Sequence, residues 1–301
     1  MSETLFHKFH EGLVVRGFAP RTVETYVRLV RKLPEHYLRS PEQISNDELS
    51  QYLLYLLREK KYARKTMIAE ISALRMFYRI VLHRSTENID EILPKWKTES
   101  RLPQVYSKEE VQRLLSVQGL QVKQMAMLIT AYAAGLRVSE VCHLRLADIL
   151  SSRMQIRIEQ GKNLKDRYTI LSPKLLNVLR NYWRIYRPAF WLFPGPRNPD
   201  KPIEARCVER TFIKALKLAG LPKRGNVHSL RHSFATHLYE SGATLTTLQG
   251  LLGHRWLTST LVYLHVTESC MAGVQSPFDS IDVAATGLAL AASRNSSPEP
   301  V

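Results

Sequence analysis

The sequence predicts a mainly α-helical protein with two domains: a helical bundle over residues 1–93, and a mixed α/β domain with a small antiparallel hairpin over residues 107–275. Three observations predict this fold class. The 301 residues are enough for about two domains. Apolar side chains recur at helical spacing along most of the chain. Residues 94–106 interrupt that pattern with two prolines and no sustained period, as expected of a linker.

Four helices are expected in the first domain. The first ends before Gly17, and Pro20 opens the second, because proline fits the first turn of a helix. Asp47 is expected to cap the third helix, and the fourth runs from about Lys65 to His83. The apolar residues that we expect on the inner faces are Leu5, Phe6, Phe9, Leu13, Val14, Val23, Tyr26, Val27, Val30, Leu33, Leu49, Leu53, Leu56, Leu57, Ile68, Ile71, Leu74, Phe77, Tyr78 and Val81.

The second domain opens with a Ser-x-x-Glu pattern, Ser107 and Glu110, in which each side chain can bond the other residue's backbone N–H and so start a helix. Helical patterning continues except at about 153–172, where apolar and polar residues alternate before a Gly-Lys turn. That pattern is typical of a β-hairpin. Residues 276–301 are rich in Ala, Ser and Pro, so we expect a mobile tail.

Charge is the strongest compositional signal. Lys and Arg total 43 against 27 Asp and Glu, a net charge of +16. Most of the surplus lies in residues 101–275, which carry 25 basic and 11 acidic side chains. A basic body of this size favours a polyanion partner, with nucleic acid first. A basic protein without such a partner is the alternative.

The cellular compartment is indicated by the cysteines, the length of the apolar runs and the N-terminal sequence. Three widely spaced cysteines, Cys142, Cys207 and Cys270, form no metal-ligand pair and indicate a reducing environment. The apolar runs are far shorter than the ~18 residues of a membrane span. The N-terminus has no secretory signal pattern. We therefore expect a cytoplasmic protein with no membrane contact.

Four segments hold residues that can act on a phosphate. They are 134–141 with Arg137 and Glu140, 160–167 with Lys162, 228–237 with His228 and Arg231, and 251–254 with His254, which Tyr263 follows nine residues later. Each segment alone has a structural explanation: a solvated arginine or lysine, a helix cap, or a tyrosine in the core. Their occurrence together, in this order, favours one shared site.

These residue types suit metal-independent attack on a phosphodiester. The pentacoordinate phosphorus gains negative charge, which two guanidinium groups can bind while they stay charged at any working pH. A tyrosine, with an ordinary pKa of about 10, becomes a nucleophile when cations and a base lie beside it. Histidine exchanges protons near neutrality, and a lysine on a hairpin can protonate the leaving oxygen.

The four segments resemble the signature of the tyrosine recombinase (phage integrase-like) family over about residues 107–275. The stretch Pro20–Tyr26 resembles that family's core-binding domain, which implies that residues 1–93 bind DNA. By this resemblance the catalytic residues are Arg137, Lys162, His228, Arg231, His254 and Tyr263, with Glu140 in support. Tyr263 would be the nucleophile, and Lys162, with Lys165 as a nearby rival, would be the hairpin lysine.

The same resemblance implies a site-specific DNA recombinase, or integrase, that cuts and rejoins DNA through a 3′-phosphotyrosyl intermediate. It implies no ATP, metal or other cofactor. The expected partner is double-stranded DNA in the nucleoid, bound by a homotetramer on paired sites, and any accessory protein is unknown. Residues 273–279 resemble the end of transposon- and integron-associated integrases, whereas residues 193–227 are short for the extra helix of integron integrases.

Several other functions stay open. The first is a catalytically silent DNA-binding protein derived from a mobile element, although such a protein has no reason to keep all six catalytic residue types. A metal nuclease would need an Asp/Glu cluster at ligand spacing, which these motifs lack. A topoisomerase-like relaxing enzyme or a Xer-like housekeeping recombinase would share the chemistry.

Overall fold

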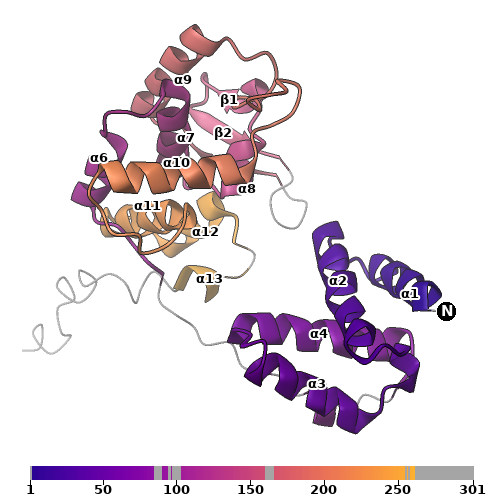
Figure 1. Ribbon diagram of the computed structural model, residues 1–301. Coiled ribbons are helices and arrows are strands. Elements are labelled where there is room, and N and C mark those ends of the chain that lie inside the picture. Colours follow the sequence, from indigo (N-terminus) through magenta and orange to yellow (C-terminus); the bar gives the residue numbers. More distant parts are fainter. Residues whose placement is uncertain are drawn as a thin grey trace, which may run out of the picture. The chain divides into compact units, whose positions relative to one another are not determined.

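The computed structural model describes residues 2–84, 90–93, 96, 103–159, 166–254, 256 and 258–261. The chain forms two compact units, Met1–Arg101 and Leu102–Val301, and each has its own hydrophobic core. Figure 1 labels their elements. The linker predicted over 94–106 lies largely outside the described residues, and the tail predicted over 276–301 lies wholly outside them.

The described part of the N-terminal unit is helical, as predicted. It contains α1 (Ser2–Val15), α2 (Pro20–Tyr37), a 3-10 turn η1 (Pro41–Gln43), α3 (Asn46–Arg58) and α4 (Arg64–Ile80). Helix α2 packs against both α1 and α4. Phe9, Leu33 and Phe77 are fully buried between these helices, so the predicted apolar faces do form one core.

Two details of this unit differ from expectation. Ser45, not Asp47, caps α3: its hydroxyl accepts a hydrogen bond from Glu48 N at 3.3 Å, and the Glu48 carboxylate accepts one from Ser45 N at 2.8 Å. This reciprocal capping box leaves Asp47 in the first turn, where the helix dipole favours an acid. Val14, expected inside, is 52% exposed, because Leu13 takes the inward position of that turn.

The described part of the C-terminal unit combines helices with one small sheet. Its elements are α6 (Lys108–Leu115), α7 (Val122–Ala133), α8 (Val138–Cys142), η2 (Leu146–Asp148), β1 (Ile149–Leu150), β2 (Gln155–Ile158), β3 (Arg167–Ile170), α9 (Pro173–Tyr186), α10 (Ala205–Leu218), α11 (His228–Glu240), α12 (Leu245–Leu252) and α13 (Thr258–Leu261). The predicted fold class is confirmed. So is the capping box of α6, in which Ser107 N and Glu110 N each donate to the other side chain, at 2.9 and 3.2 Å.

The predicted hairpin is present, as β2 and β3, with Ile158 opposite Arg167. A third antiparallel strand, β1, pairs Ile149 with Ile156. At two residues it is too short to produce a recognisable alternating pattern. Met154, which belongs to the stretch 153–172 predicted as a hairpin, lies in the turn before β2 with φ +51°.

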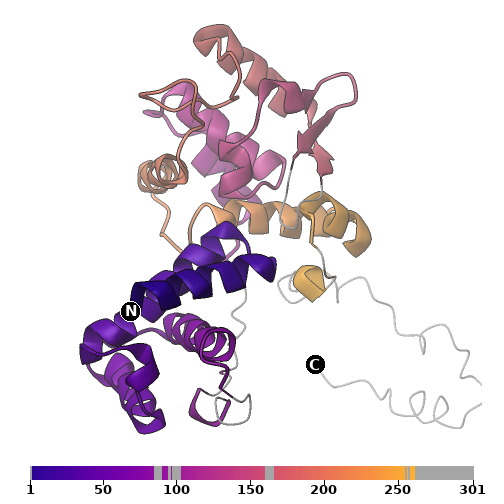
Figure 2. The same ribbon diagram turned by 90° about the vertical axis from the view of Figure 1, so that its right-hand side faces the viewer.

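Helix α7 forms the centre of the C-terminal unit. From Met125 on its sequence carries no charged residue, and most of residues 126–131 are buried, which is typical of a helix enclosed by others. It packs against α9, α10 and α11. In Figure 1, α9 and β1 lie above α10, and α11 and α12 lie below it; Figure 2 shows α11 and α12 below the strands from the side. Helix α12 contacts both α11 and β3, so distant segments of the chain meet there.

Among the helices of the described residues, none combines the length and the apolar character that crossing a membrane requires.

Candidate active site

Arg137 is fixed by a tight turn and a helix cap. The turn contains Gly135 at φ +62°, a left-handed conformation that glycine adopts without strain. A Cβ at Gly135 would lie only 2.4 Å from the ring of Phe234. Arg137 then occupies the N-cap of α8. Its backbone N donates to Glu140 Oε2 at 2.8 Å, and its Nη1 donates to Oε1 at 2.7 Å.

The carboxylate of Glu140 holds three arginines together. Besides Arg137, it accepts hydrogen bonds from Nη1 and Nη2 of Arg167, at 2.8 Å each, and Arg231 Nη1 lies 3.5 Å away. Burial acts to raise the pKa of Glu140, but the hydrogen bonds and charge of Arg167, with smaller contributions from Arg137 and Arg231, lower it to about 2. Glu140 is therefore ionised throughout the neutral range.

Arg231 lies near the start of α11 and is 1% exposed. A buried charge is tolerated only where it is paired and hydrogen-bonded. Arg231 Nη1 donates to the carbonyl oxygen of Gly135 at 2.8 Å, and Nη2 donates to that of Leu252. The side chain thus joins the turn before Arg137 to the end of α12, and it shares Glu140 with Arg137.

His228 and His254 lie within the electrostatic range of both predicted arginines. Burial lowers the pKa of His228, and the charges of Arg231 and Arg137 lower it further. The same causes, burial first, lower the pKa of His254 to about 4. Both imidazoles are therefore neutral at pH 7, and each can act as a hydrogen-bond donor and as a proton acceptor.

The position of His254 follows from the end of α12. Gly253 ends that helix with φ +62°, as a left-handed C-cap. His254 Nδ1 lies 2.9 Å from Thr260 Oγ1 in α13. The cap and this hydrogen bond together determine the direction of the ring.

Two predicted catalytic residues lie outside the described residues. Lys162 and its rival Lys165 belong to 160–165, and Tyr263 belongs to 262–301. The structure thus brings together Arg137, Glu140, His228, Arg231 and His254. The catalytic roles of all the predicted site residues stay predictions.

Sequence reasoning missed Arg167 and His232. Arg167 belongs to the predicted segment 160–167, but nothing local marks an arginine at the start of a strand as part of a site. Its side chain is 9% exposed. His232 lies one helical turn after His228, with ring centroids 5.5 Å apart. Burial, then the charges of His228 and Arg231, lower the pKa of His232 to about 4. A four-residue histidine spacing on one helix was the available signal.

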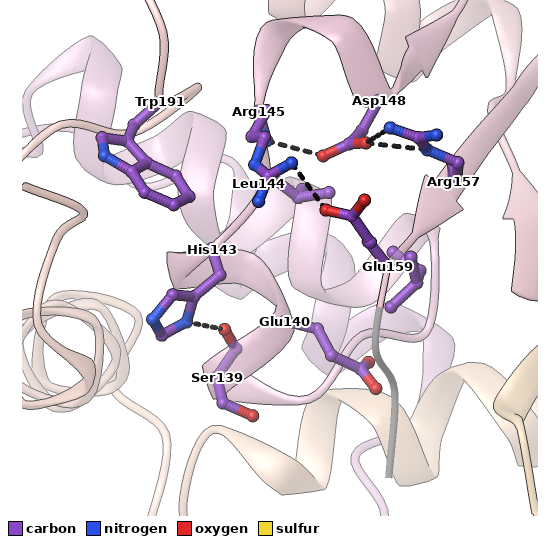
Figure 3. A pocket seen from close by; sticks show the side chains of 10 residues that line it. Ser139, Glu140, His143, Leu144, Arg145, Asp148, Arg157, Glu159 and Trp191 are labelled. Carbon is purple, nitrogen blue, oxygen red and sulfur yellow. Dashed lines mark hydrogen bonds and ion pairs between the residues drawn. The ribbon is translucent and has the colours of Figure 1, made fainter. Parts of the chain in front are cut away.

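A cavity of about 250 Å³ borders Glu140 (Figure 3). Its two arginines are each paired with an acid: Arg145 with Glu159 at 2.6 Å, and Arg157 with Asp148 at 3.1 Å. Because Glu140 adds a further negative charge to its wall, this cavity offers an anion no positive surplus, and we assign it no part in phosphate binding.

The cluster around Glu140 has the opposite balance. Three guanidinium groups against one carboxylate leave two positive charges, bordered by two neutral imidazoles. Guanidinium groups bond phosphate oxygens with a matching geometry. The arrangement can therefore hold a phosphodiester, stabilise negative charge that develops on it, and move a proton beside it.

Comparison with known proteins agrees with this chemistry. Residues 104–269 match the phage integrase family, and residues 5–88 match the phage integrase N-terminal SAM-like domain. A Sinorhizobium fredii protein named as a candidate integrase/recombinase is 42% identical over 275 residues, covering 91% of this chain and 88% of that protein. A tyrosine recombinase of Pseudothermotoga lettingae is 32% identical over 289 residues, covering 93% of this chain and 98% of that protein.

The fold also resembles that of solved structures. A solved structure of a lambda integrase dimer bound to a COC′ core site has a TM-score of 0.69 at 20% identity, covering 85% of this chain and 96% of that chain. The family match covers more than half of the present sequence. The chain therefore belongs to the phage integrase family and is a tyrosine-type site-specific DNA recombinase.

Proposed function

We propose that the chain breaks and rejoins DNA strands through Tyr263, assisted by Arg137, Lys162, His228, Arg231 and His254, with Glu140 in support. One observation carries the proposal: Arg137 and Arg231, from distant segments, meet on the Glu140 carboxylate. Both of their charges also act on the two histidines. Arginines grouped on one carboxylate beside two histidines are well suited to bind a phosphate group and to transfer a proton next to it.

The proposed reaction has two transfers. Tyr263 Oη attacks the DNA phosphorus and the bond from phosphorus to the 5′-oxygen breaks, which gives a 3′-phosphotyrosyl ester and a 5′-hydroxyl. The phenol proton passes to His228, and the leaving oxygen takes a proton from Lys162. A 5′-hydroxyl of the partner strand then attacks the ester and releases the tyrosine. Since the ester conserves the phosphodiester bond energy, the exchange needs no ATP.

Exposure supports different tasks for the arginines. The side chain of Arg137 is 19% exposed, against 9% for Arg167 and 2% for Arg231. Arg137 is accordingly the group that bonds the non-bridging oxygens most directly. The more deeply buried Arg231 contributes positive charge to the site. A preorganised donor of this kind contributes on the order of 10²–10³ in rate.

The proposed partner is double-stranded DNA. The N-terminal unit also binds it, and four copies of the chain act on two paired sites in the nucleoid of the cytoplasm. The basic surplus of residues 101–275 supports a polyanion partner, and exchange between two duplexes needs one nucleophile for each of four strands cut.

The test is covalent capture from a library of nicked duplexes. A nick next to the cleavage position lets the short fragment that carries the freed 5′-hydroxyl diffuse away, which traps the ester. Wild-type protein should therefore become attached to a defined set of sequences. Attachment should persist in EDTA. The Tyr263→Phe variant should capture no DNA yet bind it within about 3-fold of wild type, because it loses only one hydroxyl. Site-selective binding without capture by the wild type would favour the silent DNA-binding alternative.

A further inference from the structure

Arg167 connects three elements of the C-terminal unit. It is the first residue of β3, and its Nη1 and Nη2 donate to the two oxygens of Glu140 in α8, at 2.8 Å each. Its Nε donates to the carbonyl oxygen of Leu251 in α12 at 2.9 Å. A guanidinium group is planar, so these three hydrogen bonds fix β3, α8 and α12 relative to one another.

Gly253 gives a second, independent observation. A Cβ at this residue would lie 2.6 Å from Arg167 Cδ and 3.0 Å from Nε. The stem of Arg167 therefore packs directly against the left-handed turn that separates α12 from His254. No residue larger than glycine fits there while Arg167 keeps its position.

From these contacts we propose that Arg167 is a positioning residue of the recombination site, which holds Glu140 against Arg137 and holds the turn that carries His254. It acts through these two groups and not on the DNA, because three of its N–H groups are committed to protein atoms and its side chain is 9% exposed. This inference rests on the proposed function of the site.

The charges around Glu140 make the effect of Arg167 depend on pH. Three cations face Glu140: Arg137 from its own helix, Arg167 from β3 and Arg231 from α11. Arg167 is the largest influence that lowers the pKa of Glu140, and it opposes the effect of burial. Without Arg167 the pKa of Glu140 should rise, because burial is then opposed only by Arg137 and Arg231. The carboxylate should then keep a proton to higher pH than in the wild type, and a protonated Glu140 bonds Arg137 less strongly.

The experiment compares Arg167→Met with Arg157→Met in a single-turnover assay of covalent attachment to a nicked duplex selected as above. Arg157 is the matched control, because it lies on the neighbouring strand β2 and also pairs with one acid, Asp148. At pH 7.5 we expect Arg167→Met to attach about 10²-fold more slowly, the effect of displacing a catalytic group by about 1 Å. Arg157→Met should stay within about 3-fold, and DNA affinity within about 3-fold for both.

Two further readouts separate positioning from a general loss of structure. The rate ratio of wild type to Arg167→Met should grow as the pH falls from about 7.5 to 5.5, since the variant protonates Glu140. The double variant Arg167→Met, Glu140→Gln should attach no more slowly than the slower single variant, because both changes break one unit. If the methionine variant does not fold, Arg167→Lys, which keeps the charge but loses the planar fork, replaces it and should still be impaired.

The outcomes decide between the two proposals. Wild-type attachment that depends on Tyr263, together with an unimpaired Arg167 variant, a constant rate ratio or multiplicative effects in the double variant, would overturn the role of Arg167 alone. Absence of attachment that depends on Tyr263 in the wild type would overturn the proposed function itself.

Discussion

The imidazole Nδ1 of His254 lies 2.9 Å from the hydroxyl oxygen of Thr260. Thr260 is fully buried and belongs to α13, which ends at Leu261, two residues before Tyr263. The contact links the orientation of a predicted phosphate-binding ring to the segment that leads to the predicted nucleophile. With Nδ1 engaged, Nε2 is the ring nitrogen that we expect to face a phosphate.

Replacing Thr260 with valine should therefore slow covalent attachment. Valine has nearly the shape of threonine but lacks the hydroxyl group, so the His254 ring loses its orienting partner. We expect a fall of about 10-fold in the single-turnover rate with little change in DNA affinity, as for other residues that orient a catalytic histidine. Thr260→Ser, which keeps the hydroxyl, is the control and should stay near wild type. Equal rates for the valine and serine variants would show that this hydrogen bond has no catalytic role.

Glu140 should make the stability of the C-terminal unit depend on pH. Its pKa falls from the ordinary 4.5 to about 2 on folding, which corresponds to about 3 kcal/mol of stabilisation. Because the folded-state pKa is the lower one, this contribution is fully present above about pH 4.5 and is lost as the pH falls through 2. Glu140→Gln removes it.

Urea denaturation at two pH values measures this contribution. At pH 7 the free energy of unfolding should be lower for Glu140→Gln than for wild type by about 3 kcal/mol. At pH 3 the gap should be smaller, since the wild type has then lost part of the same term. A gap that does not change with pH would mean that the carboxylate charge is not what stabilises the cluster.

The sequence predicted those parts of the fold and site that have local signatures. The capping box of Ser107 and Glu110 is encoded within four residues, and the hairpin is encoded by alternation around one turn. The cap of α3 is encoded in the same way, since Ser45 and Glu48 form the same Ser-x-x-Glu pattern. The prediction of Asp47 as the cap was wrong, although aspartate is itself a good capping residue.

Arg167 could not be predicted in the same way. Its partners, Glu140 and Leu251, are 27 and 84 residues away in sequence. Leu251 meets Arg167 because α12 packs on β3, and Glu140 meets it from α8. The deep burial of Arg231 has the same origin, since a charged residue near the start of a helix is ordinarily exposed. Residue order indicated which groups share the site, but only the packing showed that one carboxylate joins the arginines.

Gly135 and Gly220 give a matched pair for testing the turn before Arg137. Both have positive φ, +62° and +63°, but a Cβ at Gly135 would meet the Phe234 ring at 2.4 Å, whereas at Gly220 it would meet nothing within 4 Å. Gly220→Ala should therefore lose only about 1–2 kcal/mol of stability, the strain of a left-handed alanine. Gly135→Ala should lose more, because Phe234 must also move.

The two alanine variants should also differ in activity. A displaced Phe234 shifts the Gly135 carbonyl that accepts from Arg231, so Gly135→Ala should attach to nicked DNA more slowly even at a temperature where it is fully folded. Gly220→Ala should retain the wild-type rate. Urea denaturation combined with the attachment assay checks both statements, and similar losses in the two variants would argue against the steric account.

Finally, the protonation of His254 should report phosphate binding directly. In the DNA-free protein, burial and the charges of Arg231 and Arg137 lower the pKa of His254 from its ordinary 6.5 to about 4. A phosphate bound among these groups brings negative charge that favours the imidazolium, so the pKa should rise. NMR titration of ¹⁵N-labelled histidines measures it, with His254→Asn to assign the resonance. We expect a midpoint near pH 4 without DNA and a higher one with a nicked duplex in the Tyr263→Phe background, which prevents cleavage. A midpoint that DNA does not move would place the bound phosphate away from His254 and its arginines.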